Sequence, residues 1–303
     1  MIFLLDQVEA TPNFFLPRPN ASTSSYNFSF EEIRRSAGGA EDIHRVMRAL
    51  PGIFSTSDGI NALVVRGGHP RENLTLLDGI EIPNSNHFVD QGTSSGGISM
   101  INLDFVRECS FYTGGFPAKY GDKLSSVMDI KFRDGNKDRW QADIYSGFAG
   151  FGAMVEGPLF SQKGSWMASA RRSYLDLLVD VLPSSLSVTA IPNYSDFQAK
   201  ITYDLSNTDT IDLIGIGGSD KMKIKSADDN ISRGFDTLDY NNYQYTLGLK
   251  WQRLFSQKGY STIILSRSSY RYLFDGGIVL GAAPSLMILG KVKTNSKEKL
   301  TTI

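Results

Sequence analysis

Three histidines, one cysteine and an Asp-Gly pair are the residues of this chain whose chemistry is most suited to catalysis or metal binding. His44, His69, His87 and Cys109 do not have the spacing of metal ligands. Isolated histidines of this kind are usually surface or packing residues, and we expect that role for each of them. The Asp-Gly pair at 78–79 predicts a turn rather than a catalytic carboxylate.

Motifs of other reaction classes are also missing from the sequence. It contains no nucleophile elbow, phosphate-binding loop or zinc-binding helix. The glycine pairs at 67–68 and 114–115 are not followed by a helix with the spacing of a dinucleotide fingerprint, so they predict turns and close packing. We therefore predict that the protein is not an enzyme and that it uses no cofactor and no metal.

The stretch from Asn84 to Ser95 is polar and can form many hydrogen bonds. Asn86, His87 and Gln91 are the side chains in it that offer amide and imidazole groups. This composition suits contacts with a bound molecule better than it suits a packed core. The elements around the stretch decide where such contacts lie.

Length and charge restrict the class of protein. The chain has 303 residues, which suggests about two domains. Lys plus Arg is 31 and Asp plus Glu is 32, a net charge of −1, so there is no electrostatic basis for nucleic-acid binding. Hydrophobic residues make up 41%, too few for a bundle of membrane helices but compatible with a transmembrane barrel. The single Cys109 excludes an internal disulfide, and we expect it to be a small buried residue.

The first residues show no export signal. Met1–Leu5 is apolar, but Asp6 and Glu9 follow it and no basic segment precedes it. We therefore expect a fragment or a processed chain. The longest weakly polar run, 276–290, is too short for a spanning helix and contains Pro284, so it predicts a loop.

The first half of the chain predicts an α+β unit over residues 29–135, after an extended lead over residues 1–28. Ser29 and Glu32 have the spacing of a capping box, which starts a helix that the glycines at 38–39 end. A second helix is predicted from Ala40 to Leu50. The predicted strands are Leu63–Arg66, Leu74–Leu77, Gly79–Ile82, Val106–Tyr112 and Ser125–Phe132.

The second half alternates apolar and polar residues in one strand after another. From Asp196 to Leu205 the odd-numbered residues are apolar and the even-numbered ones are polar. The segment from Asn242 to Phe255 shows the same pattern, and shorter alternating segments begin at Trp140 and Trp166. Each of these strands therefore has one apolar and one polar face.

The connections between these strands alternate in length. Tight turns are predicted at 161–164, 206–209 and 256–259, and longer polar loops near 175–194 and 220–238. Strands of about ten residues or more, with aromatic ends and this loop pattern, favour an outer-membrane barrel. A soluble β-sandwich or lipocalin-like barrel also alternates and stays open as an alternative.

The strand count predicts an incomplete barrel. We count about seven strands and the start of an eighth near Lys291–Ile303. An unclosed set would leave unpaired backbone groups in lipid. Residues 136–303 are therefore predicted to be the N-terminal strands of an antiparallel transmembrane β-barrel in a longer protein.

Four segments in the first half together resemble TonB-dependent outer-membrane receptors, the energised transporters of Gram-negative bacteria. They are 42–53 (DIHRVMRALPGI), 63–68 (LVVRGG), 74–80 (LTLLDGI) and 114–130 (GGFPAKYGDKLSSVMDI). The resemblance is close over about residues 31–133 and rests on the strand pattern from 139 to 303. It implies that residues 29–135 are a plug domain inside a 22-strand barrel.

The resemblance also implies roles for single residues. Arg66 matches a plug arginine that contacts the barrel. Thr113 stands where the family commonly has a second arginine, so we expect rearranged plug contacts, with carboxylate partners possible beyond the end of this chain. The resemblance and the polar composition of the stretch 84–95 together make Asn86, His87 and Gln91 candidates for ligand binding.

The lead at Asp6, Gln7 and Val8 resembles the segment that contacts TonB, where an extended chain adds as a strand to a partner. The implied partners are a TonB-type inner-membrane complex, outer-membrane lipid and, in one branch, a surface lipoprotein. The implied location is the outer membrane, with the plug facing the periplasm.

The resemblance favours energised import of a scarce ligand, such as an iron chelate, a cofactor or an oligosaccharide. Two alternatives stay open: a barrel for signalling or adhesion without import, and a soluble β-rich binding protein.

Overall fold

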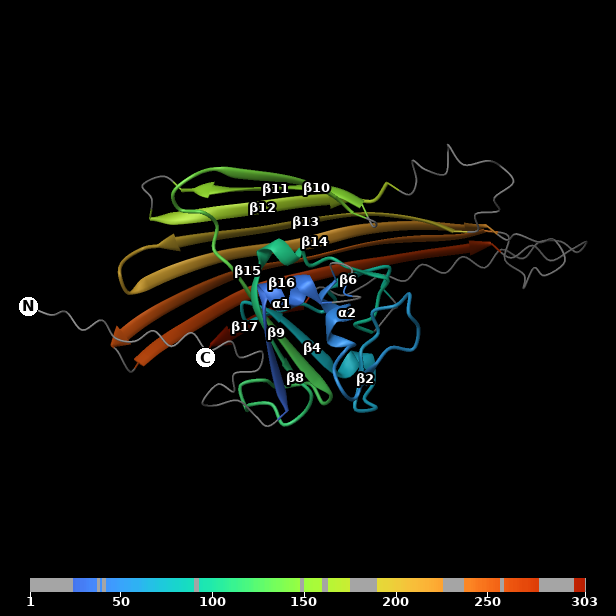
Figure 1. Ribbon diagram of the computed structural model, residues 1–303, viewed down its shortest axis with the longest axis horizontal. Coiled ribbons are helices and arrows are strands. Elements are labelled where there is room, and N and C mark those ends of the chain that lie inside the picture. The colour runs from blue at the N-terminus through green and yellow to red at the C-terminus, as the bar shows by residue number, and fades with distance from the viewer. Residues whose placement is uncertain are drawn as a thin grey trace, which may run out of the picture.

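The computed structural model describes residues 24–36, 39, 42–89, 93–147, 150–159, 163–174, 190–225, 237–256, 259–277 and 297–302. A long antiparallel sheet curves over one side of a smaller unit of mixed structure, the plug unit (Figure 1). Gln91 and the lead residues Asp6, Gln7 and Val8 lie outside the described residues, so their roles stay predictions.

The plug unit is built on a five-stranded sheet with the order β1-β8-β9-β4-β5. Strands β4 and β9 are parallel and the other neighbours are antiparallel. The lead predicted over residues 1–28 ends in β1, because its backbone pairs with β8. The other four strands confirm the predicted ones. Their bounds are β1 Ser25–Ser29, β4 Asn73–Leu77, β5 Ile80–Glu81, β8 Val106–Tyr112 and β9 Ser126–Phe132.

The turn between β4 and β5 is the predicted Asp-Gly hairpin. Asp78 has φ 51° and Gly79 has φ 90°. Two consecutive positive φ angles are what a tight two-residue hairpin requires, and Asp-Gly is a favoured sequence for it. Asp78 Oδ1 accepts from Phe132 N of β9 at 3.3 Å, which ties the turn to the plug sheet.

Helix α1 (Phe30–Arg35) begins at the predicted capping box. Ser29 N donates to the Glu32 carboxylate at 2.7 Å, and Glu32 N donates to Ser29 Oγ at 3.4 Å. The helix ends at Arg35, before the glycines at 38–39.

Helix α2 (Ile43–Met47) is shorter than the prediction of Ala40 to Leu50. It starts later because the Asp42 carboxylate caps it by accepting from His44 N at 2.9 Å. It ends earlier because Ala49 N and Leu50 N bond three residues back, which tightens the last turn.

Two small hairpins and two 3₁₀ turns complete the plug unit. The strand predicted at 63–66 is shorter in the structure because Arg66 and Gly67 have φ angles of 50° and 81°, which end it. The elements are β2 Ile53–Phe54 paired with β3 Val64–Val65, β6 Asn86–His87 paired with β7 Ile98–Ser99, η1 Pro70–Glu72 and η2 Leu103–Phe105.

The second half forms one antiparallel sheet of eight strands in sequence order, the barrel wall. This confirms the prediction of seven strands and the start of an eighth. The strands lengthen from 7 residues in β10 to 20 in β15. Their bounds are β10 Gln141–Gly147, β11 Gly150–Pro158, β12 Gly164–Arg172, β13 Ala190–Asp204, β14 Asp209–Lys225, β15 Thr237–Ser256, β16 Gly259–Gly277 and β17 Lys297–Thr302.

Three predicted loops are wrong at their edges. Strand β13 begins at Ala190, inside the loop predicted at 175–194. Strand β14 ends at Lys225 and β15 begins at Thr237, both inside the loop predicted at 220–238. Strand β16 ends at Gly277, inside the loop predicted at 276–290. The ends of β14 and β15 are polar and have no apolar face from which a strand could be predicted. Backbone pairing does not require one, and Asp220 stands opposite Asn242 in the ladder.

The wall has an apolar outer face and a polar inner face, the opposite of the arrangement in a soluble protein. Phe197 on β13 and Leu247 on β15 are each 52% exposed on the outer face. The polar Gln198 and Lys200 of β13 are buried on the inner face, against the plug unit. A soluble β-sandwich buries its apolar face, so this arrangement favours a wall whose outside is in lipid.

The core of the plug unit continues into the wall. Ile43, Met47 and Phe105 lie in one apolar cluster with the wall residues Met154 and Ile214. Cys109 lies in the same cluster, fully buried as predicted, and burial raises the pKa of its thiol. In the part of the chain that the structure describes, no helix has both the length and the apolar character that crossing a membrane requires.

Candidate functional site

Strand β13 holds the plug unit along its length. Its even-numbered residues from 196 to 202 face inward, and three of them make polar contacts with the plug itself. Gln198 Nε2 donates to Met100 O at 2.6 Å. On β15, Gln244 Nε2 donates to Asn86 O at 2.7 Å. The inner face of the wall is thus matched to the backbone and side chains of the plug.

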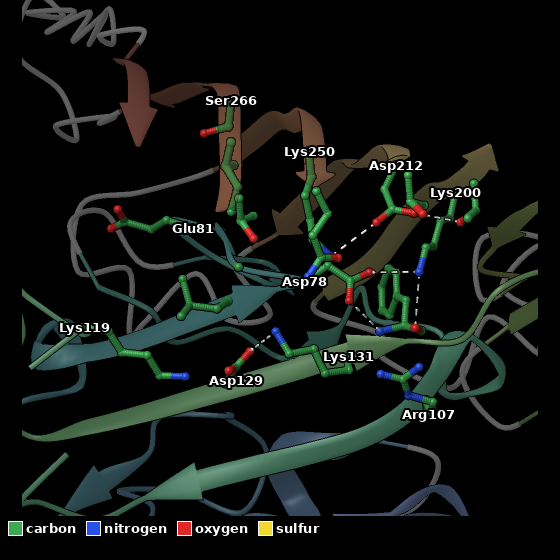
Figure 2. A pocket seen from close by; sticks show the side chains of 18 of the residues that line it. Asp78, Glu81, Arg107, Lys119, Asp129, Lys131, Lys200, Asp212, Lys250 and Ser266 are labelled. Atoms are coloured by element: carbon green, nitrogen blue, oxygen red, sulfur yellow. Dashed lines mark hydrogen bonds and ion pairs between the residues drawn. The ribbon is translucent and has the colours of Figure 1, made fainter. Parts of the chain in front are cut away.

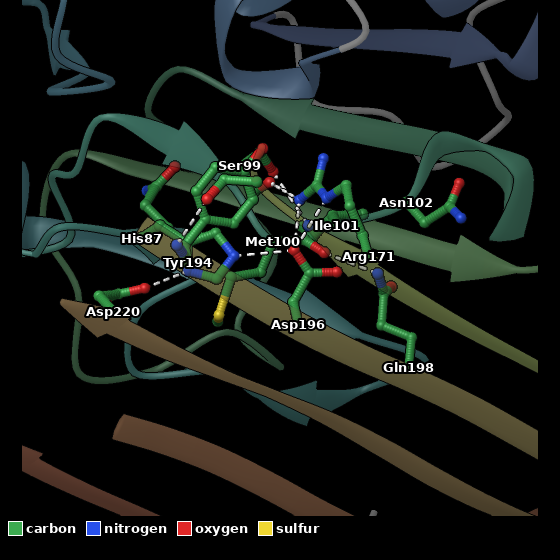
Figure 3. A network of polar contacts seen from close by, with 12 residues as sticks. His87, Ser99, Met100, Ile101, Asn102, Arg171, Tyr194, Asp196, Gln198 and Asp220 are labelled. Atoms are coloured by element: carbon green, nitrogen blue, oxygen red, sulfur yellow. Dashed lines mark hydrogen bonds and ion pairs between the residues drawn. The ribbon is translucent and has the colours of Figure 1, made fainter. Parts of the chain in front are cut away.

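One end of this interface is a cluster around His87, which we call the His87 clamp (Figure 3). It consists of His87 from the plug and Asp196, Asp220 and Arg171 from the wall. His87 Nε2 lies 2.8 Å from Asp196 Oδ2, and Nδ1 contacts Asp220 Oδ1. Arg171 Nε donates to Asp196 at 2.8 Å and its Nη2 donates to Ser99 O at 2.5 Å.

Burial and charge set the protonation of His87. The residue is 0% exposed, and both flanking carboxylates are almost completely buried. Burial by itself lowers the pKa of His87, but the hydrogen bonds and charges of Asp196 and Asp220 outweigh it and hold the pKa above its usual value. The two carboxylates thus favour the imidazolium form of the ring.

The backbone next to His87 is held in an unusual conformation. Phe88 has φ 54°, which a bulky residue rarely adopts. Its N–H donates to Asp220 Oδ2 at 3.0 Å, and Asn242 Nδ2 donates to the same oxygen at 2.9 Å. The Tyr194 ring lies 4.5 Å from the His87 ring, centroid to centroid. The wall thus fixes the conformation of this plug segment.

Gly218 on β14 makes room for the His87 ring. A Cβ at this position would lie 2.7 Å from His87 Cε1 and 2.6 Å from Met100 Sδ. Both distances are shorter than real contacts allow. The His87 clamp therefore requires a glycine in the wall at this point.

The other end of the interface is the Lys200 clamp, formed by Lys200 of β13 and by Asp78, Asp134 and the carbonyl of Phe132 (Figure 2). Lys200 Nζ lies 3.2 Å from Asp78 Oδ2 and 2.9 Å from Asp134 Oδ1, and it donates to Phe132 O at 3.3 Å. Lys200 and Asp78 have side chains 5% and 4% exposed. Here the wall supplies the cation and the plug and its linker supply the carboxylates.

The linker between plug and wall is fixed by Arg133. Its Nη1 and Nη2 donate to Glu156 of β11 at 2.7 and 2.9 Å, a bidentate pair. Asn136 N donates to the same carboxylate at 2.9 Å. The first wall strands are thus held to the end of β9.

A cavity of about 540 Å³ lies between the plug and strands β13 to β16, on the side of the short turns. Charged residues line both of its sides (Figure 2). The lining side chains that the contacts above do not use include Arg107, Lys119 and Lys131 from the plug and Lys250 from β15. The volume is large enough for a small polar molecule.

The structure places the predicted site residues in different surroundings. Asn86 and His87 are both 0% exposed and lie against the wall rather than in solvent. Arg66 is exposed, and its Nη2 donates to Ser24 Oγ of the plug at 3.0 Å. Its predicted contact with the barrel stays a prediction. Thr113 is buried, and its N–H donates to Ser24 O at 3.0 Å.

The carboxylates that bind plug cations lie within this chain. Asp196 and Asp220 bind His87, and Glu156 binds Arg133. The cations in these contacts are a histidine and a linker arginine, and the rearrangement expected from Thr113 stays a prediction. The sequence signal was available: ionisable residues on the polar face of a barrel strand are costly unless they are paired, so Asp196 and Lys200 were candidates for function.

His44 forms a second buried polar group with Ser85 and Asp42. Its Nε2 lies 3.0 Å from Ser85 Oγ and its Nδ1 lies 3.4 Å from Asp42 Oδ1. Burial alone raises the pKa of Asp42, but hydrogen bonds from His44, Asn61 and Ser99 outweigh it and lower the pKa. The order Asp-His-Ser resembles a hydrolase triad. All three residues are at least 95% buried, however, so the group holds loops together rather than reaching a substrate.

His69 has a local role, since its Nδ1 accepts from Arg71 N at 3.2 Å and caps η1. Of the three histidines, His44 and His87 are buried in polar groups and His69 is a cap. Among the described residues, no group of three or more His, Cys, Asp or Glu is arranged to hold a metal ion.

Fold and interface together define a class of protein, a membrane barrel wall with a folded plug on its polar inner face. Residues 18–126 match the family model of the TonB-dependent Receptor Plug Domain. The plug unit is thus similar to the plug domain of TonB-dependent receptors, and the strands that follow it have the fold of these receptors' barrels. TonB-dependent receptors are transporters and not enzymes, and they lie in the outer membrane of Gram-negative bacteria.

Solved structures with this fold include three receptors. The siderophore receptor PirA from Acinetobacter baumannii has 16% identity and a TM-score of 0.62, over 93% of this chain and 44% of its own. A mutant of the ferric enterobactin receptor PfeA from Pseudomonas aeruginosa has 14% identity and a TM-score of 0.59, over 93% and 45%. FpvA from P. aeruginosa, bound to a heterologous pyoverdine, has 15% identity and a TM-score of 0.57. The match covers 86% of this chain and 36% of the FpvA chain.

At these identities the likeness shows the fold, and this chain spans less than half the length of each of the three. No curated protein matches the chain.

Proposed function

We propose that this protein imports a scarce ligand across the outer membrane through its plugged barrel. The observation that supports this most is the polar character of the plug–wall interface. When the plug moves, water can take over the hydrogen bonds of the two clamps and of the amide-to-carbonyl pairs, which offsets part of the cost of separating them. The apolar cluster that plug and wall share has no such compensation. A plug held by such polar contacts can move and return.

An iron chelate is the first ligand class to test. PirA and PfeA are named as siderophore and ferric enterobactin receptors, and FpvA is bound to a pyoverdine in an iron complex. A cofactor and an oligosaccharide are the other two classes. We infer that the polar stretch 84–95 supplies plug contacts to the ligand. Since Asn86 and His87 are buried, their part in this is to fix the stretch, and Gln91 is the proposed direct contact.

The energy for import comes, in this proposal, from a TonB-type inner-membrane complex. Asp6, Gln7 and Val8 contact it by strand addition, with the plug facing the periplasm. Arg66 is the proposed contact of the plug with barrel strands outside this chain. The barrel is surrounded by outer-membrane lipid, and a surface lipoprotein is a further proposed partner for polymeric ligands.

Uptake of a panel of labelled ferric siderophores by cells that make the full-length protein tests the proposal. We expect uptake that stops when the proton gradient is collapsed. Val8→Pro removes a backbone donor and is expected to abolish uptake without changing ligand binding, whereas Asp6→Asn keeps the backbone donor and serves as the matched control. Uptake that continues without the gradient contradicts the proposal. Binding without any uptake favours signalling or adhesion.

A further inference from the structure

His87 differs chemically from the other cations of the plug–wall interface. Lys200, Arg133 and Arg171 keep their charge throughout the neutral pH range. Histidine is the side chain whose ordinary pKa lies in that range. One of the two clamps therefore depends on a proton that can be removed under mild conditions.

The geometry of the His87 clamp requires both ring protons. Each ring nitrogen faces a different carboxylate, Asp196 at Nε2 and Asp220 at Nδ1. Ionised carboxylates only accept hydrogen bonds, and a neutral imidazole has a single N–H. When the ring loses a proton, one carboxylate faces a nitrogen lone pair, and neither carboxylate is exposed enough for water to replace the lost donor.

The charged and titratable groups around His87 decide whether its contact with Asp196 or its contact with Asp220 is lost on deprotonation. They are Asp196 and Tyr194 from β13, Asp220 from β14 and Arg171 from β12. The neighbouring β15 side chain is the neutral Asn242. The net charge of His87, Arg171, Asp196 and Asp220 is zero when His87 is protonated and −1 when His87 is neutral.

Asp196 keeps a cation in either state, because Arg171 donates to it through Nε. Asp220 keeps two neutral donors, the Phe88 N–H and the Asn242 amide. The contact with β14 is therefore the weaker one after deprotonation. The Asp220 carboxylate also accepts from the Phe88 N–H, so a shift of this carboxylate away from the neutral ring lets the positive-φ backbone at Phe88 relax.

We propose that the His87 clamp is a pH-operated latch, which fastens the plug segment 84–89 to β14 when the ring is protonated and releases it when the ring is neutral. The direction follows from the raised pKa of His87. The latch is complete below the pKa of the free ring, about 6.5, and is lost as the pH rises through the higher folded value. The latch concerns the protein without ligand or energising partner, and it stands or falls independently of import.

Hydrogen exchange of the full-length protein in detergent tests the latch. Protection of peptides covering 84–89 is measured from about pH 5 to about pH 9, with exchange times corrected for base catalysis. We expect protection to fall in one transition with its midpoint above about 6.5. Protection of β8 and β9 in the same samples is expected to stay constant.

Asp220→Asn is expected to lower the midpoint by about one pH unit or more, because one of the two opposing charges is removed while both neutral donors keep an acceptor. His87→Gln is expected to remove the transition. His44→Gln serves as the matched control, since His44 is a buried histidine that contacts Ser85 within the same segment.

A flat profile in the wild type overturns the latch without any variant having to fold. A transition that survives His87→Gln, or that disappears with His44→Gln, assigns the titration to another group and also overturns it.

Discussion

The two clamps hold the same plug to the same wall strand with opposite charge arrangements. In the His87 clamp the plug supplies the cation and the wall supplies two carboxylates. In the Lys200 clamp the wall supplies the cation, and the plug and its linker supply the carboxylates. Asp196 and Lys200 lie on one face of β13, about 13 Å apart at the rise of a β-strand.

This inversion separates the two ends of the interface. A plug that slides by one clamp length along β13 brings like charges together in either direction. His87 approaches Lys200 in one direction, and Asp78 approaches Asp196 in the other. The pattern thus fixes the register of the plug on the wall. It also gives the two ends different chemistry, since only the His87 cation titrates near neutral pH.

Removing the permanent cation is expected to have the largest effect. Lys200→Met keeps the length of the side chain and leaves the buried Asp78 carboxylate facing an apolar group. Breaking a buried pair by deleting one partner costs about 3 kcal/mol or more, which corresponds to at least a hundredfold loss of protection. Hydrogen exchange of the 78–82 turn measures it.

The double variant Lys200→Met with Asp78→Asn sharpens that result. If burial of an unpaired charge causes the loss, the second substitution restores part of the protection at 78–82. Equal losses in the single and double variants would show that the Lys200 stem, and not its charge, supports the turn.

The next largest effect is expected at the other clamp. Gly218→Ala places a Cβ within 2.7 Å of the His87 ring, which cannot move because both of its nitrogens are bound. Overpacking of this kind costs about 1–3 kcal/mol. We expect weaker protection at 84–89 and unchanged protection at 78–82. The matched control is Gly215→Ala on the same strand, whose Cβ meets the flexible end of Leu247 at 3.1 Å.

A smaller effect distinguishes the clamps by pH. Burial alone raises the pKa of Asp134, but the charge and hydrogen bond of Lys200 outweigh it and lower the pKa. A carboxyl with a lowered folded pKa contributes stability above its unfolded pKa, about 3.9, and loses it as the pH falls through the folded value. The Lys200 clamp is thus expected to weaken in acid, whereas the His87 clamp weakens as the pH rises.

Exchange of the linker peptides around 132–138 in mild acid checks this direction. Asp134→Asn is expected to remove the acid-sensitive part. Protection in the wild type that stays constant at the lowest pH at which the barrel is folded would contradict the assignment.

Local patterns predicted the elements of this fold but not its interface. The capping box at Ser29 and Glu32, the Asp-Gly hairpin at 78–79 and the alternation of β13 each depend on neighbouring residues, and each appears in the structure. The polar ends of β14 and β15 were missed because their pairing depends on another strand and not on an apolar face.

The site was predicted only in part, because its contacts join residues far apart in sequence. His87 meets Asp220 across 133 positions, and no spacing rule detects this. The polar composition of 84–95 singles out Asn86 and His87 as candidates for ligand contact. In the structure both are buried against the wall, because hydrogen-bonding side chains serve a polar protein surface as well as a ligand, and the ligand contact stays a prediction.

The smallest expected effect tests whether burial, and not charge alone, makes the clamps strong. Lys137 of the linker pairs with Asp204 at the end of β13 at 2.6 Å, shorter than any distance of Lys200 to a carboxylate, but the two side chains are 40% and 38% exposed. Water screens such a pair, so Lys137→Met is expected to cost less than about 1 kcal/mol, against the larger loss for Lys200→Met. Both variants replace lysine by methionine near the same end of one strand, and their linker and turn peptides can be followed in one exchange experiment. An equal loss of protection in Lys137→Met and Lys200→Met would show that burial does not strengthen the ion pairs along β13. The distinction between a buried clamp and a surface pair would then be wrong.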